Sequence, residues 1–247
     1  MVLDNTKVIC KDLGIIDYQT AWDYQEELLQ QNINIKSQLR NLTGENIPGG
    51  LSTTSYFLLC EHPAVYTLGK SGSMHNMLIS KEERDEKGIQ FFNTNRGGDI
   101  TFHGLQQIVG YPIIDLEKYY TDIGRYLRNL EEVIILTIAE YGIKGERSKG
   151  ETGVWIDAGI TGRERKICAM GVRCSRWITM HGFALNVNTD LSYFDKIIPC
   201  GIQNKQVTSI AKELGSTVNF EEAKEKIKRN FEIVFQSELL YSDNLYK

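Results

Sequence analysis

The chain has 247 residues and a formal net charge of −4, with 41% hydrophobic and 24% charged residues. This composition is typical of a globular protein, and we expect one domain over residues 1–247. The acidic balance excludes a broad nucleic-acid-binding face. No apolar run approaches the roughly 18 residues of a membrane helix, and residues 1–13 lack a signal peptide's apolar stretch. We therefore expect a cytoplasmic protein that makes no membrane contact.

The first half of the chain is predicted to mix short helices and strands. Asp17 is a candidate N-cap for a helix over residues 17–31. Residues 30–54 are rich in Asn, Gln, Ser and Gly and include Pro48, so we expect a flexible surface insert there. Strands are predicted at 56–60, 89–94 and 108–116. A short charged helix begins at the capping box of Ser80 and Glu83 and ends at Gly88.

The second half begins with one strongly periodic helix. Apolar side chains recur at three- and four-residue spacing over residues 122–141, and Gly142 ends the helix. Strands are predicted at 153–157, 166–174, 178–180 and 183–187, with a hairpin turn at 159–162. Helices at 207–214 and 220–239 close the chain, the second capped by Asn219. Strands grouped between helices, without regular βαβ alternation, predict an α+β fold.

The cysteines form no recognisable framework. Their number is odd, no C-x-x-C pair occurs and the four histidines complete no zinc pattern, so we expect neither disulfides nor a metal site. Cys168 and Cys174 alternate with Met170 and Val172 on one face of a predicted strand, which favours a role as small core side chains. The five cysteines are Cys10, Cys60, Cys168, Cys174 and Cys200.

Cys200 stands apart because it lies between Pro199 and Gly201. Cysteine is among the most buried residue types, whereas Pro and Gly mark a turn. A thiol on such a turn is fixed in direction and accessible, as a nucleophile must be. The alternative is a thiol packed at a tight corner, and this segment alone does not exclude it.

Lys166 is the candidate for activating that thiol. A thiol attacks as the thiolate, and a nearby ammonium group favours that form. Lys166 begins an otherwise apolar strand, where a lysine is costly unless it is paired or at an edge. Taken alone, this position favours a solvated lysine at the end of the strand.

Other segments are candidates for binding a ligand. The pair Gly97 and Gly98 lets the backbone approach a ligand closely, with Arg96 to fix a charged or carbonyl group; a β-turn with a surface arginine is the alternative. The pair matches neither the G-x-G-x-x-G nor the Walker pattern. The triplets at 169–171 (Ala-Met-Gly) and 182–184 (Gly-Phe-Ala) suit an apolar slot, although ordinary sheet packing explains them as well.

Taken together, these segments resemble the lipoyl(octanoyl) transferase family. The resemblance rests on residues 95–104 (NRGGDITFHG), 107–112, 166–173, 181–187 and the Pro-Cys-Gly turn, within a match from about residue 61 to 202. It implies the mixed-sheet fold shared with biotin and lipoate protein ligases, and no metal or dissociable cofactor. It also implies that Cys200 and Lys166 are the catalytic pair. The substrate-binding residues that it implies are Arg96, Gly97, Gly98, Asp99, Ile100, Thr101, Phe102, His103, Ala169, Met170, Gly171, Gly182, Phe183 and Ala184.

The activity that this resemblance implies is acyl transfer. The family moves octanoyl groups from octanoyl-acyl carrier protein to lysines of lipoyl domains, in 2-oxoacid dehydrogenases and in the glycine cleavage H protein. Cys200 would carry the acyl group as a thioester. Lys166 would hold the thiolate and then act as a base toward the incoming lysine amine.

Other residues around the expected pocket receive supporting roles. For His103 the sequence leaves a proton carrier, a hydrogen-bond donor and a structural residue open, and we favour a supporting role. His62 belongs to a structural wall at residues 61–69, and His181 would help to shape the site. Backbone N–H groups near Met170, Gly171 or Gly201 are candidates for stabilising an oxyanion.

Two rival functions follow from the same residues. An ATP-dependent lipoate or biotin protein ligase of this fold would need a nucleotide loop, and the chain lacks the glycine- and arginine-rich loop of the ligases. A non-catalytic module that binds acyl carrier protein would have no need of Cys200. Because acyl carrier proteins are acidic, we also expect a local basic patch at the entrance. Its candidates are Arg125, Arg128, Lys144, Arg147 and Lys149.

Overall fold

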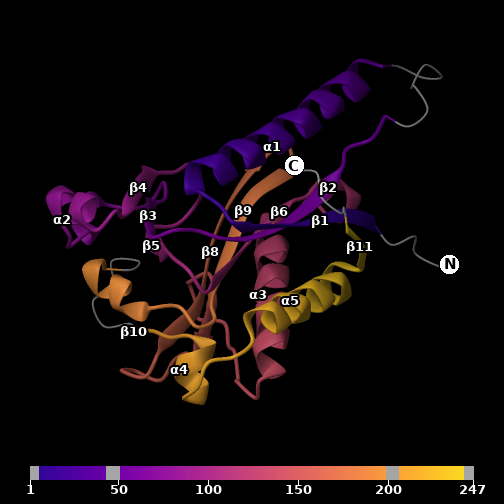
Figure 1. Ribbon diagram of the computed structural model, residues 1–247. Helices are drawn as coiled ribbons and strands as arrows, with labels where there is room; N and C mark the ends of the chain where they lie inside the picture. The colour runs from indigo at the N-terminus through magenta and orange to yellow at the C-terminus, as the bar shows by residue number, and fades with distance from the viewer. Residues whose placement is uncertain (1–5, 43–50, 199–205, 242–247) are drawn as a thin grey trace.

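A large mixed β-sheet forms the centre of the computed structural model, which describes residues 6–42, 51–198 and 206–241 (Figure 1). The strand order is β10-β8-β9-β6-β2-β1-β11, and β7 pairs with β8. The outer pairs β1–β2, β1–β11 and β8–β10 are parallel, and the central pairs are antiparallel. The strands are β1 (Thr6–Ile15), β2 (Ser55–Glu61), β6 (Gln107–Ile113), β7 (Val154–Ile156), β8 (Arg165–Ser175), β9 (Ile178–Asn186), β10 (Gln206–Val207) and β11 (Ser237–Tyr241).

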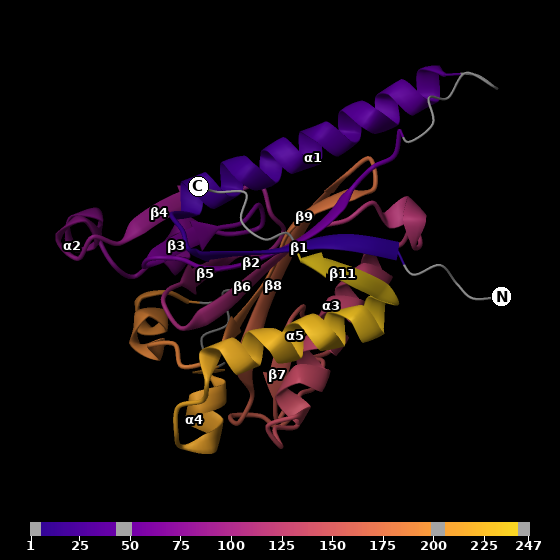
Figure 2. The same ribbon diagram turned by 45° about the vertical axis from the view of Figure 1, so that its right-hand side comes forward.

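Helices cover both faces of this sheet, as Figure 2 shows. Helix α1 (Tyr18–Asn41) lies across one face, where Leu28 and Leu29 pack with the sheet residue Leu58. Helices α3 (Ile123–Ala139) and α5 (Phe220–Phe235) lie on the other face. There Phe231 stacks on Phe57 with ring centroids 4.3 Å apart. The predicted α+β class, a mixed sheet flanked by helices, is confirmed.

A smaller three-stranded sheet lies beside the N-terminal end of α1 (Figure 1). Its order is β4-β3-β5, and its core includes Tyr66 and Phe102. The Phe102 ring stacks on Tyr193 at 4.4 Å between centroids. The elements here are β3 (Val65–Leu68), β4 (Gln90–Asn93), β5 (Ile100–His103), α2 (Lys81–Glu86) and the 3-10 helices η2 (Met74–Asn76) and η4 (Leu191–Lys196).

The local signals for helix starts and turns are confirmed. Ser80 and Glu83 form the predicted capping box. Asp17, Asp122 and Asn219 are the N-caps of α1, α3 and α5. The hairpin turn between β7 and β8 contains two glycines with positive φ, at 83° and 81°. These caps and turns depend only on neighbouring residues, which is why they can be read from sequence.

Helix α1 corrects the prediction of a surface insert over residues 30–54. The helix continues to Asn41, and its polar side chains find buried partners that the sequence cannot reveal. Asn32 exchanges two 2.8 Å hydrogen bonds with the backbone of Thr54. The Lys36 ammonium is buried, 2.7 Å from the Asp115 carboxylate. Residues 43–50 lie outside the described part of the chain, and the expectation of one domain with a flexible segment stays a prediction.

Three further boundaries differ from prediction. The runs at 178–180 and 183–187 belong to one strand, β9, joined through His181 and Gly182. The helix predicted from residue 207 begins at Ile210 as α4 (Ile210–Leu214), because Val207 pairs with Lys166 as part of β10. The last helix ends at Phe235, and residues 237–241 form β11 against β1. His181 and Gly182 pair with Val172 and Gly171 of the neighbouring strand β8. The other two changes reflect pairings between segments distant in sequence, which override local propensity.

In the part of the chain that the structure describes, none of the helices combines the length and the apolar character that crossing a bilayer requires.

Candidate active site

A cavity of about 650 Å³ lies where the two sheets and the start of α3 meet. Every predicted substrate-binding residue except Phe102 lines it, and so does Lys166. Phe102 instead packs in the core of the smaller sheet, because its side chain points to the opposite face of β5 from those of Thr101 and His103. Cys200 lies outside the described residues.

The described residues that flank the 199–205 segment are connected to this cavity. The Ile198 N–H donates to the Asn76 carbonyl at 2.7 Å, and the Asn76 side chain donates to the Asp99 carboxylate at 2.6 Å. On the far side, Val207 pairs with Lys166 and lines the cavity. The residue before this segment, Ile198, is thus linked through Asn76 to a predicted binding residue, and Val207 after it is paired with Lys166.

Lys166 is half-buried in β8 between β7 and β10. Its ammonium lies 4.6 Å from the centroid of the Trp155 ring, a cation–π distance. The Thr208 N–H donates to its carbonyl at 2.9 Å, which holds the backbone of Lys166 against the strand that follows Cys200. The solvated strand-end lysine that the sequence alone favours does not describe this position.

The paired glycines let backbone segments approach one another closely. The Gly97 N–H donates to the Val172 carbonyl of β8 at 2.9 Å. A Cβ atom on Gly171 would lie 2.5 Å from the Gly97 carbonyl oxygen, so only glycine fits there. Gly98 has φ +87°, a conformation that favours glycine. We expected these glycines to let a ligand approach the backbone closely. At these positions it is another segment of the protein's own backbone that does so.

Arg96 fixes carbonyl groups of the protein itself. It is buried, and its guanidinium donates to the Thr67 carbonyl at 2.7 Å and to the Gly97 carbonyl at 3.1 Å. It also donates to the Thr67 hydroxyl at 2.8 Å. These bonds hold the glycine segment against β3.

A directional chain of hydrogen bonds continues from Arg96 beneath the cavity. The Gln107 amide N–H donates to Asn186 at 2.8 Å, so its oxygen faces His103 and accepts from Nδ1–H at 2.9 Å. His103 Nε2 then carries the lone pair and accepts from the Thr67 hydroxyl at 3.3 Å. Asn186 in turn donates to the Thr208 carbonyl at 3.0 Å. This series of hydrogen bonds runs from Arg96 to Thr208, whose N–H donates to the Lys166 carbonyl. Hydrogen bonds in such a series polarise and strengthen one another.

His103 is a neutral member of this chain. Burial lowers its pKa to about 3, and the charges of His62 and Arg96 act in the same direction. Both ring nitrogens have protein partners. This geometry agrees with the favoured supporting role, because both ring nitrogens are engaged with protein groups and neither is free to exchange a proton with a ligand.

The structure adds residues that the sequence did not single out. Tyr18, Tyr111, Ile123, Leu127 and residues 150–152 line the cavity. Tyr111 lies in the run 107–112 that carries the resemblance. The others come from elements whose approach depends on the fold, and no local signal marks them.

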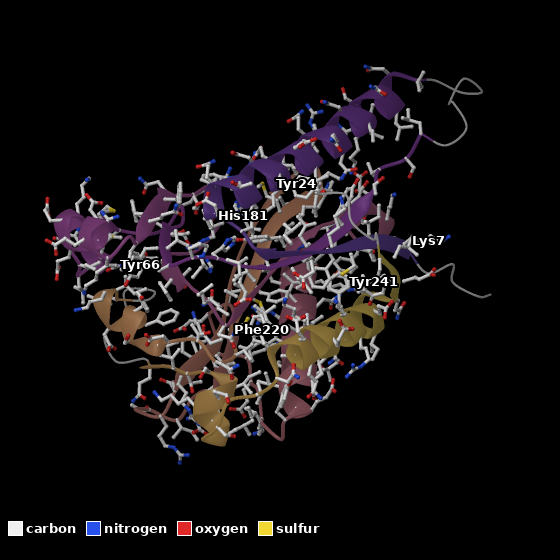
Figure 3. All side chains as sticks on the ribbon, viewed as in Figure 1. Lys7, Tyr24, Tyr66, His181, Phe220 and Tyr241 are labelled. Atoms are coloured by element: carbon white, nitrogen blue, oxygen red, sulfur yellow. The ribbon has the colours of Figure 1, made fainter. Side chains whose placement is uncertain are left out.

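His181 lies under α1 (Figure 3) and also lines the cavity. Its φ of +57° is unusual for a residue with a side chain. Its Nε2 lies 2.7 Å from the Asn95 side-chain oxygen, which ties β9 to the segment before Arg96. In the sequence it is marked by its position directly before Gly182 and within the run 181–187 that carries the resemblance, and its role in shaping the site stays a prediction.

Three of the five candidates for the basic patch lie beside carboxylates. Arg128 and Arg147 both contact the buried Glu131 carboxylate, at 2.8 and 3.1 Å. Lys144 contacts Glu146 at 2.6 Å. Arg125 instead stacks on the Tyr120 ring at 4.2 Å. These carboxylates offset part of the positive charge, and the basic patch stays a prediction.

The four cysteines that the structure describes are poor nucleophiles. Burial raises the pKa of Cys10 to about 12 and raises the pKa values of Cys60, Cys168 and Cys174 as well. Cys168 is fully buried and Cys174 half-buried against the core beneath α3, as predicted.

Comparisons with known proteins agree on one family. Residues 17–232 match the family described as "Lipoyl protein ligase A/B catalytic domain". An octanoyltransferase of Christiangramia forsetii is 57% identical over 96% of this chain and 99% of its own length. One from Flavobacterium psychrophilum is also 57% identical, over 94% and 97%.

Solved structures show the same fold at low sequence identity. A lipoate protein ligase from Thermoplasma acidophilum, studied with its E2 lipoyl domain, has a TM-score of 0.66 at 14% identity, over 96% of this chain and 87% of its own. A lipoate-protein ligase A bound with ATP has a TM-score of 0.65 at 11% identity, over 97% and 89%.

Proposed function

Because this chain belongs to the lipoyl(octanoyl) transferase family and is an acyltransferase, we propose that it moves an octanoyl group from octanoyl-acyl carrier protein to a lysine of a lipoyl domain. Cys200 carries the acyl group between the two partners. The observation that supports this most directly is the position of Lys166 at the cavity, paired with Val207 just beyond the Cys200 segment.

In the first half-reaction the Cys200 thiolate, favoured by the Lys166 ammonium, attacks the thioester carbonyl carbon. A new C–S bond forms and the bond to the carrier's sulfur breaks. The carrier leaves as a thiolate and takes up a proton. Octanoyl-Cys200 no longer has a negative sulfur beside Lys166.

In the second half-reaction the acceptor lysine attacks octanoyl-Cys200 as the free amine. Lys166, which has given up its proton, accepts one from the attacking nitrogen. The amide bond forms, the C–S bond breaks and Cys200 returns as the thiolate beside the recharged ammonium. The net products are the octanoyl-lysine amide and the carrier thiol, without ATP.

The Met170 N–H is the candidate that we favour for the oxyanion of both steps. Backbone groups alternate in direction along a strand. The Val172 carbonyl points away from β9, since it accepts from Gly97, so Met170, two residues earlier in an unbroken register, points the same way. Gly171 directs its backbone groups to β9 instead. Of these two backbone N–H groups, that of Met170 is therefore the better placed to donate to an oxyanion.

ATP dependence separates this function from the rival ligase. We expect the protein to octanoylate a lipoyl domain from octanoyl-acyl carrier protein in the absence of ATP, followed by intact mass of the domain. Product only with free octanoate and ATP would make the protein a ligase. Binding of the carrier without any product would favour the non-catalytic module. The cytoplasmic location and the choice between 2-oxoacid dehydrogenase domains and glycine cleavage H protein stay predictions.

The variant Lys166→Arg tests the two roles of the lysine separately. Arginine keeps the positive charge but does not deprotonate in proteins. We expect partial acylation by octanoyl-acyl carrier protein and a loss of about 100-fold or more in transfer to the lipoyl domain. Measuring both half-reactions by mass spectrometry checks this, and normal transfer by the variant would rule out the base role.

A further inference from the structure

The cavity extends over both faces of β8. Ala169 and Gly171 pair with Ala184 and Gly182, whereas the intervening Met170 pairs with Phe183. Successive side chains of a strand point to opposite faces. Arg173 reaches Glu26 of α1, so the odd-numbered residues face α1. Met170 and Val172 pack with the core beneath α3, yet both sets line one cavity.

The two parts of the cavity meet at an open stretch of the β8 edge. Among the residues that the structure describes, β7 pairs along the edge opposite β9 only as far as Cys168, while β10 pairs with Arg165 and Lys166 on the other edge. The next contact along the edge opposite β9 is the Gly97–Val172 hydrogen bond. Residues 169 and 170 therefore leave a gap through which the cavity passes from one face to the other.

The two lobes differ in burial. The inner lobe, on the α1 face, is lined by Tyr18, Val109, Tyr111, Ala169 and Ala184, and all of these except Ala169 are at most 4% exposed. The outer lobe, on the α3 face, is lined by Ile123, Leu127, Met170, Val172 and residues 150–152. Its four apolar side chains are only half-buried. A water-excluded inner lobe suits the end of an acyl chain, and the outer lobe is the open approach.

The volume also exceeds one acyl chain. At about 650 Å³ the cavity lies within the range of roughly 300–1,000 Å³ that holds a whole drug-sized ligand. An octanoyl group has only eight carbons and one oxygen, so it leaves much of the space for another group.

We propose that the outer lobe binds the pantetheine arm on which the acyl group arrives, while the acyl chain fills the inner lobe. This inference rests on the proposed function. The arm is an uncharged chain of methylene and amide groups that ends in a phosphate. Ile123 and Leu127, one turn apart on α3, offer apolar surface to its methylenes. The Glu151 N–H already donates to the Ser148 carbonyl, and the backbone carbonyls of residues 150–152 offer acceptors to the amide N–H groups of the arm.

The half-buried apolar wall of Ile123 and Leu127 favours this uncharged arm over the acceptor lysine. A lysine would lose hydration along the apolar wall.

Filling the outer lobe tests the assignment. Leu127→Trp adds bulk at a half-exposed helix position, and Leu136→Trp is the matched control, since nine residues at 3.6 per turn place it about 180° around α3. Each protein is acylated with octanoyl-pantetheine 4′-phosphate and with octanoyl-N-acetylcysteamine, a donor without most of the arm. We expect Leu127→Trp to lower the ratio of the two acylation rates by roughly tenfold, a change of about 1.4 kcal/mol, and the control to keep the wild-type ratio. Thermal unfolding of both variants checks that the fold is intact.

Other outcomes overturn the assignment. Equal slowing with both donors would put the acyl chain itself in the outer lobe. If Leu127→Trp slowed discharge to a lipoyl domain but left acylation unchanged, the outer lobe would bind the acceptor lysine instead. If the ratio of the two acylation rates and the discharge rate were both unchanged, the outer lobe would have no role in binding. A wild-type protein that neither donor nor octanoyl-acyl carrier protein acylates would instead refute the proposed function, and this inference with it.

Discussion

At the scale of single residues, the site depends on polar groups that bind one another. Arg96 holds the carbonyls of Thr67 and Gly97, and His103 passes a hydrogen bond from Thr67 to Gln107. Residues that look like ligand contacts in the sequence thus also build the frame of the cavity. Their contacts with a substrate stay predictions. Independently of any substrate, their hydrogen bonds within the protein give a structural reason for these residue types.

Gly171 tests this frame. A Cβ atom at residue 171 would lie 2.5 Å from the Gly97 oxygen, and backbone cannot move away as cheaply as a flexible side chain. We expect Gly171→Ala to lower the free energy of unfolding by about 1–3 kcal/mol and to reduce acylation, measured by denaturant titration and by mass. Gly124→Ala, on the exposed side of α3, is the control and should do neither; equal behaviour of the two variants would refute the close-packing argument.

Sequence predicted the composition of the site better than its geometry. Lys166, Arg96 and the glycine segments could be found because each lies in a short, distinctive run. Tyr18, Leu127 and the two-sided cavity could not, because they depend on how strands and helices distant in sequence pack. The ion pairs of Arg128 and Arg147 with Glu131 were missed for the same reason.

At the scale of elements, α1 shows how tertiary partners extend a helix. Its polar second half reads as a loop, yet Lys36 lies between the Asp115 and Glu117 carboxylates at 2.7 and 2.8 Å and donates to the Arg176 carbonyl at 2.9 Å. This contact fixes the far end of α1 over the sheet. Caps and periodicity predicted where α1 and α3 begin, but β11 and the length of α1 depend on partners far along the chain.

Lys36 therefore makes a sharp test of the end of α1. Removing it leaves the buried Asp115 carboxylate without its cation, and we expect Lys36→Ala to cost about 3–5 kcal/mol in the free energy of unfolding. Lys81→Ala removes the exposed pair with Asp85 and should have no measurable effect. Denaturant unfolding of both proteins gives the comparison, and similar small losses would mean that the Lys36 pair contributes little.

At the scale of the whole molecule, three buried histidines link stability to pH. Burial lowers the pKa values of His62, His103 and His181 to about 4, 3 and 3, from 6.5 in the unfolded chain. Between these values and 6.5 the unfolded chain binds more protons than the folded one. Their stabilising effect is complete above pH 6.5 and is lost as the pH falls.

We expect the free energy of unfolding to fall on acidification from about pH 7 to 5.5, by up to about 1.4 kcal/mol per pH unit for each histidine. Denaturant titrations at several pH values measure this slope. His62→Gln should reduce the slope, and His75→Gln, at an exposed position, should leave it unchanged. A slope that is flat, or equal in all three proteins, would contradict neutral buried histidines.

The central claim is that Cys200 carries the acyl group, and intact mass after mixing with octanoyl-acyl carrier protein tests it most directly. Burial and a raised pKa make Cys10, Cys60, Cys168 and Cys174 poor competitors. We predict one octanoyl group on the wild type, mapped to the peptide that contains Cys200, absent from Cys200→Ala and present in Cys174→Ala. An adduct that persists in Cys200→Ala, or octanoyl transfer by that variant at the wild-type rate, would contradict the account.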